Sequence, residues 1–369
     1  AERLLTRRGG AAALAAAALV LAALPGLFRL RVEDSWADNF DPRSPLVTAE
    51  RDFNAAFWGS WRCDVVFSGK GELFATPAGV ALLERFGEMA RRAPHAGGVL
   101  SIQLPYETAA RIYGDPLPVS RLPPREVMRI SLLIEALQKR IDLRNYATLD
   151  RTAARARVFV KDADYSRGRA LVSYLERRLP EVLTGLPAMG VEGVRAHLSG
   201  DLTVAMEVVG SVVGNQLRSI AWTALAIAAM LACVYRSLRL TAIVMTPVAA
   251  ATLLIFAGLG WAGIPLGIAT SMFAALTLGA GVDFALHYLH AYRRERAAGR
   301  PHQEAVAATL ATAGRGLWWN AVVLACGFAV LTLSAISPNA RLGLLLAAAM
   351  LASYSSTVVI LPELLRRFE

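Results

Sequence analysis

The long apolar stretches of this sequence contain one acidic side chain, Asp283, and it is the residue there with the clearest chemistry. Placing a carboxylate at the centre of a bilayer costs roughly 2.5–3.5 kcal/mol on insertion scales, so such a residue faces protein or water and is by default functional. We expect Asp283 to act in ion or proton movement, with a packing hydrogen bond as the alternative. Gly279 and Gly281 precede it and are expected to allow close helix packing at the site.

Several polar side chains could share a proton with Asp283. His287 lies four residues further on and therefore shares its helix face. The other candidates are a tyrosine beside His287 and polar residues at overlapping depth in the last two apolar stretches: Tyr288, Asn320, Ser356 and Thr357. We expect these residues to form a proton relay with Asp283. The alternatives are helix–helix hydrogen bonds for the last three, an interface anchor for Tyr288 and a polar helix-end role for His287.

The elements that must position these residues are membrane helices. The chain has 369 residues, of which 55% are hydrophobic, and its mean hydropathy is +0.42. Six apolar stretches approach or exceed the length of about 20 residues that crosses a bilayer. They are Gly9 to Phe28, Ser219 to Tyr235, Thr241 to Trp261, Gly267 to Ala291, Gly316 to Ser334 and Leu342 to Leu361. We therefore expect an α-helical membrane protein with one helix, a soluble domain and five more helices.

Arginines mark one side of this membrane protein. They precede the first stretch, lie between the second and third and between the fourth and fifth, and follow the sixth, whereas the opposite short loops carry a single charge. The positive-inside rule predicts that both termini are cytoplasmic and that the large domain lies outside, which in a bacterium is the periplasmic side of the inner membrane. Residues 293–315 are expected to form a cytoplasmic amphipathic linker on the membrane lipids. This distribution accounts for much of the net charge of +10 without a nucleic-acid partner.

A polar block separates the first and second apolar stretches, over about residues 31–218, and is expected to form an α+β domain. Strands are predicted at 63–68, 98–104, 157–161 and 191–198, and helices at 77–92, 125–139 and 165–179, with a proline-punctuated stretch at 105–124. Strand–helix–strand twice over is the ferredoxin-like, split βαβ arrangement. The expected divisions are a first transmembrane helix at 1–30, the periplasmic porter-like domain at 31–212 and the remaining helices at 213–369.

The sequence gives no sign of an enzyme. Its three cysteines, Cys63, Cys233 and Cys326, are scattered, and its five histidines show no metal-ligand spacing. No phosphate-binding G-x-x-x-x-G-K-[ST] loop is present, and the polar block has no nucleophile motif. We expect no metal and no cofactor, with protons as the coupling ion.

Three segments resemble the resistance-nodulation-division (RND) superfamily, in its MMPL-like branch of lipid exporters, which includes hopanoid-type exporters. The segment 38–45 is similar to the family's opening after its first helix, and 57–60 to its entry into the outer domain. The third segment, 279–288, is similar to its Gly-x-x-x-Asp-Tyr signature, although Phe284 replaces the tyrosine. Tyr288 or His287 could supply the missing relay group.

The resemblance implies a proton-motive-force-driven exporter of lipids or other hydrophobic molecules, with Asp283 as proton relay. Family members usually carry two such halves in tandem, so a second six-helix half or a second copy is the expected partner. Two other classes stay open. One is a sterol-sensing-like sensor module that transports nothing, and the other is a proton-driven accessory of protein secretion.

Overall fold

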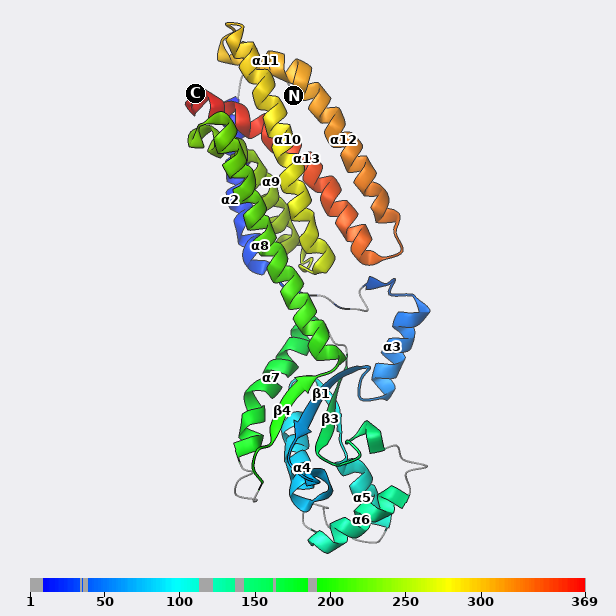
Figure 1. Ribbon diagram of the computed structural model, residues 1–369. Coiled ribbons are helices and arrows are strands. Elements are labelled where there is room, and N and C mark those ends of the chain that lie inside the picture. The colour runs from blue at the N-terminus through cyan, green and yellow to red at the C-terminus, as the bar shows by residue number, and fades with distance from the viewer. Residues whose placement is uncertain are drawn as a thin grey trace. The chain divides into compact units, whose positions relative to one another are not determined.

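The computed structural model describes residues 9–33, 35, 39–112, 122–136, 143–161, 164–184 and 191–368 (Figure 1). The chain divides into two units. The helical unit comprises Ala1–Asp41 and Val209–Glu369, and the sheet unit comprises Pro42–Val208.

The described part of the sheet unit is built on four antiparallel strands. They are β1 (Trp61–Ser68), β2 (Ala96–Leu100), β3 (Ala153–Val160) and β4 (Arg195–Ser199), in the order β2-β3-β1-β4. Helix α4 (Pro77–Arg91) connects β1 to β2, and α7 (Tyr165–Thr184) connects β3 to β4. Each of these two connections therefore joins strands that are not neighbours in the sheet.

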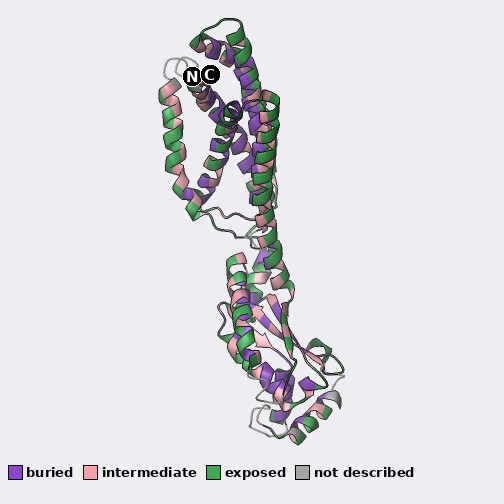
Figure 2. Ribbon diagram, turned by 60° about the vertical axis from the view of Figure 1, so that its left-hand side comes forward, coloured by how far each residue is buried: buried purple, intermediate pink, exposed green. Residues whose placement is uncertain are grey.

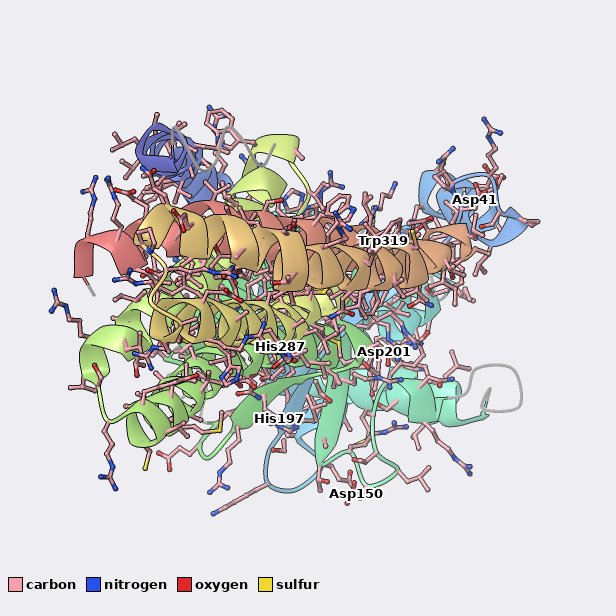
Figure 3. All side chains as sticks on the ribbon, turned by 90° about the horizontal axis from the view of Figure 1, so that it is seen from above. Asp41, Asp150, His197, Asp201, His287 and Trp319 are labelled. Carbon is pink, nitrogen blue, oxygen red and sulfur yellow. The ribbon has the colours of Figure 1, made fainter. Side chains whose placement is uncertain are left out.

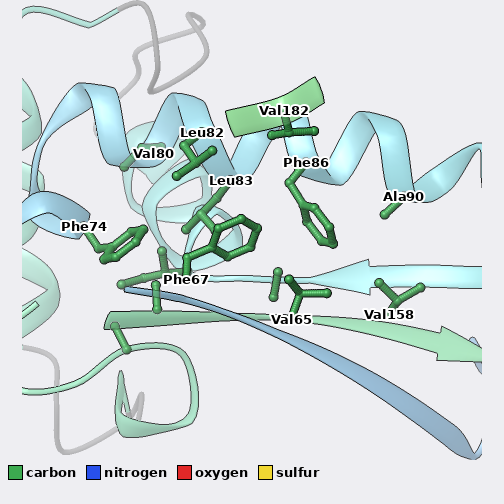
Figure 4. Close-up of a cluster of buried hydrophobic side chains, with 14 of the residues drawn as sticks. Val65, Phe67, Phe74, Val80, Leu82, Leu83, Phe86, Ala90, Val158 and Val182 are labelled. Carbon is green, nitrogen blue, oxygen red and sulfur yellow. The ribbon is translucent and has the colours of Figure 1, made fainter. Parts of the chain in front are cut away.

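Residues that are buried and residues that are only partly buried alternate along the strands, so the sheet has one face toward the core and one charged face. In β3, Ala154, Ala156, Val158 and Val160 are buried, while Arg155 and Arg157 between them are only partly buried. Figure 4 shows part of this core, in which side chains of β1, β3, α4 and α7 pack together, among them Phe67, Phe86 and Val182. Burying each large apolar side chain contributes about 1.5–3 kcal/mol, so this core is the main support of the sheet unit.

Three α-helices in the described part of the sheet unit fall outside the strand–helix–strand pattern. They are α3 (Pro45–Ala56), α5 (Gln103–Ile112) and α6 (Pro124–Ala136). Helix α3 was not expected from the sequence, although Ser44 caps it by accepting a hydrogen bond from the Val47 amide. The expectation of a strand up to 104 and then an irregular stretch was wrong for 101–112. Pro105 lies in the first turn of α5, where its missing N–H costs nothing. Residues 113–121 lie outside the described part of the chain.

Among the residues that the structure describes, six helices are long and apolar enough to cross a membrane. They are α2 (Gly9–Ala23) with the 3-10 turn η1 (Leu24–Arg29), α8 (Asp201–Tyr235), α9 (Leu238–Ala262), α10 (Ile268–Ala297), a helix over His302–Leu333, and α13 (Ser337–Phe368). The fifth consists of α11 (His302–Thr309), the π-helical turn η7 (Leu310–Gly314), α12 (Arg315–Ala329) and the 3-10 turn η8 (Val330–Leu333). The first eight residues of α8 belong to the sheet unit.

Helices α9, α10 and α13 form the packed centre of the helical unit, and α13 also packs against α12. Within an apolar segment of 18 residues in each helix, the share of buried residues is 50% in α9, 56% in α10 and 50% in α13. The same share is 6% in the first helix and 6% in α8 (Figure 2). The first helix joins this centre through two glycines. A Cβ atom on Gly260 would collide with the carbonyl oxygen of Gly26, and the Trp261 indole donates a hydrogen bond to the Ala23 carbonyl over 3.2 Å.

The expected amphipathic linker at 293–315 is not one element. Helix α10 continues without a break to Ala297, and the turn at 298–301 contains Gly299 with φ +83°. The chain then re-enters a helix at His302 that runs through η7 into α12. The sequence becomes polar after 291, which ends the apolar stretch, but residues 292–298 contain no glycine or proline. The helix therefore continues until Gly299 and Pro301 end it.

Candidate functional site

Asp283 lies on an exposed side of α10, which we call the open face. Its members are exposed residues at helical spacing: Met272, Leu276, Gly279, Asp283, His287 and His290. A Cβ atom built on Gly279 would meet nothing within 4 Å, so the backbone beside Asp283 is also uncovered. Among the described residues, Asp283, His287 and His290 have no recorded hydrogen bond or ion pair, so their side chains are available to a group outside this chain or to water.

Tyr288 lies on the opposite, packed side of α10. Its side chain is 0% exposed, and Phe284 is 1% exposed. Residues five positions apart on an α-helix point about 140° away from each other, which explains why Tyr288 does not face Asp283. The buried Tyr288 hydroxyl has no hydrogen-bond partner among the described residues. Tyr292, one turn further on, forms a 2.8 Å hydrogen bond between its hydroxyl and Nδ1 of His302.

The glycines beside Asp283 differ in their surroundings. A Cβ atom on Gly281 would lie 3.0 Å from Cγ1 of Val248 and 3.4 Å from Oγ of Ser353, so the glycine lets α9 and α13 approach α10 closely. Ser353 was missed by the sequence reasoning, and its buried hydroxyl has no hydrogen-bond partner in the described part of the chain. The sequence feature that could have identified Ser353 is that it is a small polar residue inside an apolar stretch, at the same depth as Gly281.

The remaining candidates are dispersed over α12 and α13. The Thr357 hydroxyl donates to the Ser353 carbonyl over 2.8 Å, and Ser356 is 7% exposed, so both lie on the packed side of α13. Asn320 is exposed on α12, next to Trp319, and Figure 3 shows Trp319 and His287 on different helices. Of the sequence-predicted relay, the structure therefore brings only His287 onto the face that carries Asp283.

Arginines gather where α8, α10 and α13 end. The Arg293 guanidinium lies 5.6 Å from the centre of the Tyr235 ring, which ties the end of α10 to the end of α8. Glu363 accepts hydrogen bonds from Arg366 and Arg367 at the end of α13. We call this region the arginine end of the helical unit. The open face of α10 runs toward it, since His290 is followed one turn later by the exposed Arg294.

The described residues of the sheet unit present no comparable site. Asp64 on β1 receives two hydrogen bonds from Arg157, of 2.8 Å and 3.2 Å, and an ion pair from Arg155. A shallow hollow of about 620 Å³ at one end of the sheet is lined by residues that include Val66, Tyr146 and Leu149. Within the described ranges, no three His, Cys, Asp or Glu residues lie close enough to hold a metal ion.

Comparison with known proteins places this arrangement in a family. The model of the MMPL family matches residues 144–367, which include α8 to α13 and Asp283. The chain belongs to the MMPL family. Members of the family are transporters, and the six apolar helices of this MMPL chain make it a membrane protein consistent with an RND-type transporter.

A curated relative is also similar over a shorter stretch. A protein of Methanocaldococcus jannaschii that is named as a membrane protein is 30% identical to this MMPL chain over 99 residues. The match covers 27% of this chain and 26% of that protein. The chain thus spans about a quarter of the length of the curated relative it matches.

Proposed function

We propose that this chain is one six-helix half of a proton-driven RND-type exporter of lipids or other hydrophobic molecules, in the hopanoid-type branch, and that Asp283 is its proton relay. The proposal sets the helical unit in the bacterial inner membrane, with the arginine end cytoplasmic and the sheet unit periplasmic. The strand order β2-β3-β1-β4 supports a ferredoxin-like porter domain, because two βαβ units interleaved in one antiparallel sheet have this order.

One observation carries the proposal: the carboxylate of Asp283 is exposed on a helix whose other faces are packed or apolar. In lipid, an ionised carboxylate would be costly, and two histidines on the same face would add to that cost. The open face must therefore be covered by protein or line a wet cavity in the working assembly. A second six-helix half, or a second copy of this chain, is the partner that the proposal requires.

Protonation of Asp283 would then alter helix packing. A neutral carboxyl is tolerated against an apolar partner, whereas a carboxylate needs water or hydrogen-bond donors. Binding and release of the proton by Asp283 would thus favour different arrangements of α10 and its partner. Helix α8 would transmit this change to the sheet unit, because the first residues of α8 belong to that unit. The partners are lipid substrate, membrane lipids and the second half, with protons in place of a cofactor.

The test is export of a fluorescent phospholipid analogue from proteoliposomes that hold this chain with its natural other half or as an assembled pair of copies, under an imposed proton gradient. We expect wild-type activity that Asp283→Asn abolishes without changing folding. Asp150→Asn is the matched control, since Asp150 is an exposed aspartate of the sheet unit, and it should retain activity. Equal export by Asp283→Asn and wild type would show that Asp283 is structural.

Absence of lipid export in wild type would favour the other two classes. A sensor module would show no proton-dependent movement of any probe. A secretion accessory would instead bind an unfolded polypeptide through the sheet unit, which a fluorescently labelled, reduced and unfolded protein would reveal.

A further inference from the structure

The open face of α10 changes character at Asp283. Toward one end of the helix its exposed residues are the apolar Met272 and Leu276. From Asp283 onward they are titratable, with His287 four residues later and His290 three residues after that. The exposed Arg294 follows after four more residues, so the polar part of the face reaches the arginine end without an apolar interruption.

Helical geometry places the three titratable side chains within reach of one another. Residues three or four apart on a helix have Cβ atoms about 5–6 Å apart, and this is close enough for a hydrogen bond directly or through one water. From Asp283 to His290 the helix rises about 10.5 Å, at 1.5 Å per residue. The stripe therefore covers most of the distance between Asp283 and the last turns of α10.

Imidazole is suited to pass a proton along such a stripe. Its ordinary pKa is about 6.5, and it can accept a proton on one ring nitrogen while releasing one from the other. Neither a tyrosine nor a serine ionises in that range. The replacement of the family tyrosine by Phe284 leaves His287 as the nearest titratable group on the face of Asp283.

Among the described residues, no hydrogen bond or ion pair joins this stripe to a polar or charged side chain of a neighbouring helix. The elements packed on α10 include α9, α11 and α13. Their recorded polar contacts with α10 or near it involve other residues: His302 bonds Tyr292, and Glu363 bonds Arg366 and Arg367. On α10 itself, Glu295 pairs with Arg294 and with Arg300, so the acid nearest to His290 is already neutralised.

We propose that His287 and His290 conduct the proton between Asp283 and the arginine end, with His290 as the terminal member. This inference rests on the proposed role of Asp283. The protonated carboxyl of Asp283 releases its proton to neutral His287 and becomes a carboxylate. The His287 imidazolium passes one proton to neutral His290, and the His290 imidazolium releases one to water at the arginine end. Each histidine returns to its neutral form, so one proton moves and nothing else is consumed.

Proton flux into proteoliposomes that hold the full chain and an internal pH-sensitive dye tests the path. We expect His290→Gln to lower the flux at neutral pH by roughly tenfold or more, since a positioned proton-transfer group contributes at least that much. His290→Glu keeps a titratable group and should restore much of the flux, with its pH optimum moved toward acid. His197→Gln is the control, because His197 is an exposed histidine on β4, and it should leave the flux unchanged.

The outcomes separate this inference from the proposed function. Unchanged flux in His290→Gln, together with loss of flux in Asp283→Asn, would overturn the histidine path and leave Asp283 as relay. Equal loss of flux in His290→Gln and His290→Glu would also overturn it. A titratable glutamate should restore flux if His290 transfers protons, but not if His290 is only structural. Absence of flux in wild type, or full flux in Asp283→Asn, would overturn both.

Discussion

Asp283 and Tyr288 are only five residues apart, yet they lie on opposite sides of α10. The first is exposed with no recorded partner among the described residues, and the second is fully buried in the packed centre. A proton path that uses Asp283 is therefore separated by the body of its own helix from the tyrosine that follows it. In the proposed relay, this relationship separates the side chains that can share a proton with Asp283 from those that pack in the centre of the helical unit.

Replacing Tyr288 by phenylalanine should leave proton flux intact. The substitution removes a buried hydroxyl that has no hydrogen-bond partner in the described part of the chain, so the free energy of unfolding should stay equal or rise by up to about 1 kcal/mol. Thermal unfolding in detergent and proton flux in proteoliposomes measure the two effects. Loss of flux at wild-type stability would show that the hydroxyl serves the path through water.

The two glycines near Asp283 should respond differently to alanine. In Gly281→Ala the new methyl would lie 3.0 Å from Val248, and overpacking of this kind typically costs about 1–3 kcal/mol. In Gly279→Ala the methyl meets nothing within 4 Å, and alanine favours the helix by about 0.5–1 kcal/mol. Thermal unfolding of the two variants should thus shift in opposite directions. Equal shifts would mean that α9 and α13 do not pack on Gly281.

Asp64→Asn should destabilise the sheet unit. Asp64 is 9% exposed and holds Arg157 and Arg155 on the charged face of the sheet, so its loss should cost about 2 kcal/mol. Glu181→Gln breaks the exposed pair with Arg178 and serves as the control, with an expected change below about 1 kcal/mol. Urea unfolding followed by tryptophan fluorescence compares them, and equal destabilisation would contradict the assigned importance of Asp64.

The Cys63 thiol should resist alkylation up to high pH. Burial raises the pKa of this thiol to about 11, whereas an unfolded cysteine titrates near 8.5. The unfolded state therefore loses its proton first, so this group favours folding fully below about pH 8.5 and progressively less as the pH rises toward 11. Iodoacetamide labelling in a Cys233→Ser, Cys326→Ser background measures the effect. Rapid labelling at pH 8 in the folded protein would contradict it.

Much of the fold could be predicted from the sequence, because hydropathy and periodicity depend on local composition. All six spans correspond to helices, and α4 begins at the expected Pro77 and ends within one residue of the expected position. Each strand of the small antiparallel sheet overlaps a predicted strand segment, but the bounds differ: β3 begins four residues early at Ala153, and β2 ends four residues early at Leu100. Such boundaries depend on neighbouring strands, since β3 is held between β1 and β2.

The arrangement of the candidate relay residues could be predicted only in part, because depth along a span does not give the direction of a side chain. Asn320, Ser356 and Thr357 were grouped with Asp283 by depth, but Ser356 and Thr357 are turned into the packed side of α13. The sequence analysis did not single out His290, although its spacing from His287 places both residues on one face of α10. Sequence shows that two residues share a face of one helix, whereas which face is open depends on how three helices pack.

The central claim is that the open face of α10 is an interior face of the working assembly. A spin label at Gly279→Cys in reconstituted protein, with Cys63, Cys233 and Cys326 replaced, measures this directly through collisions with oxygen dissolved in lipid. The control label replaces Trp222, which is 70% exposed on α8. We predict clearly lower oxygen access at position 279 than at position 222. Equal access at both positions would mean that Asp283 faces lipid, and this would contradict the account.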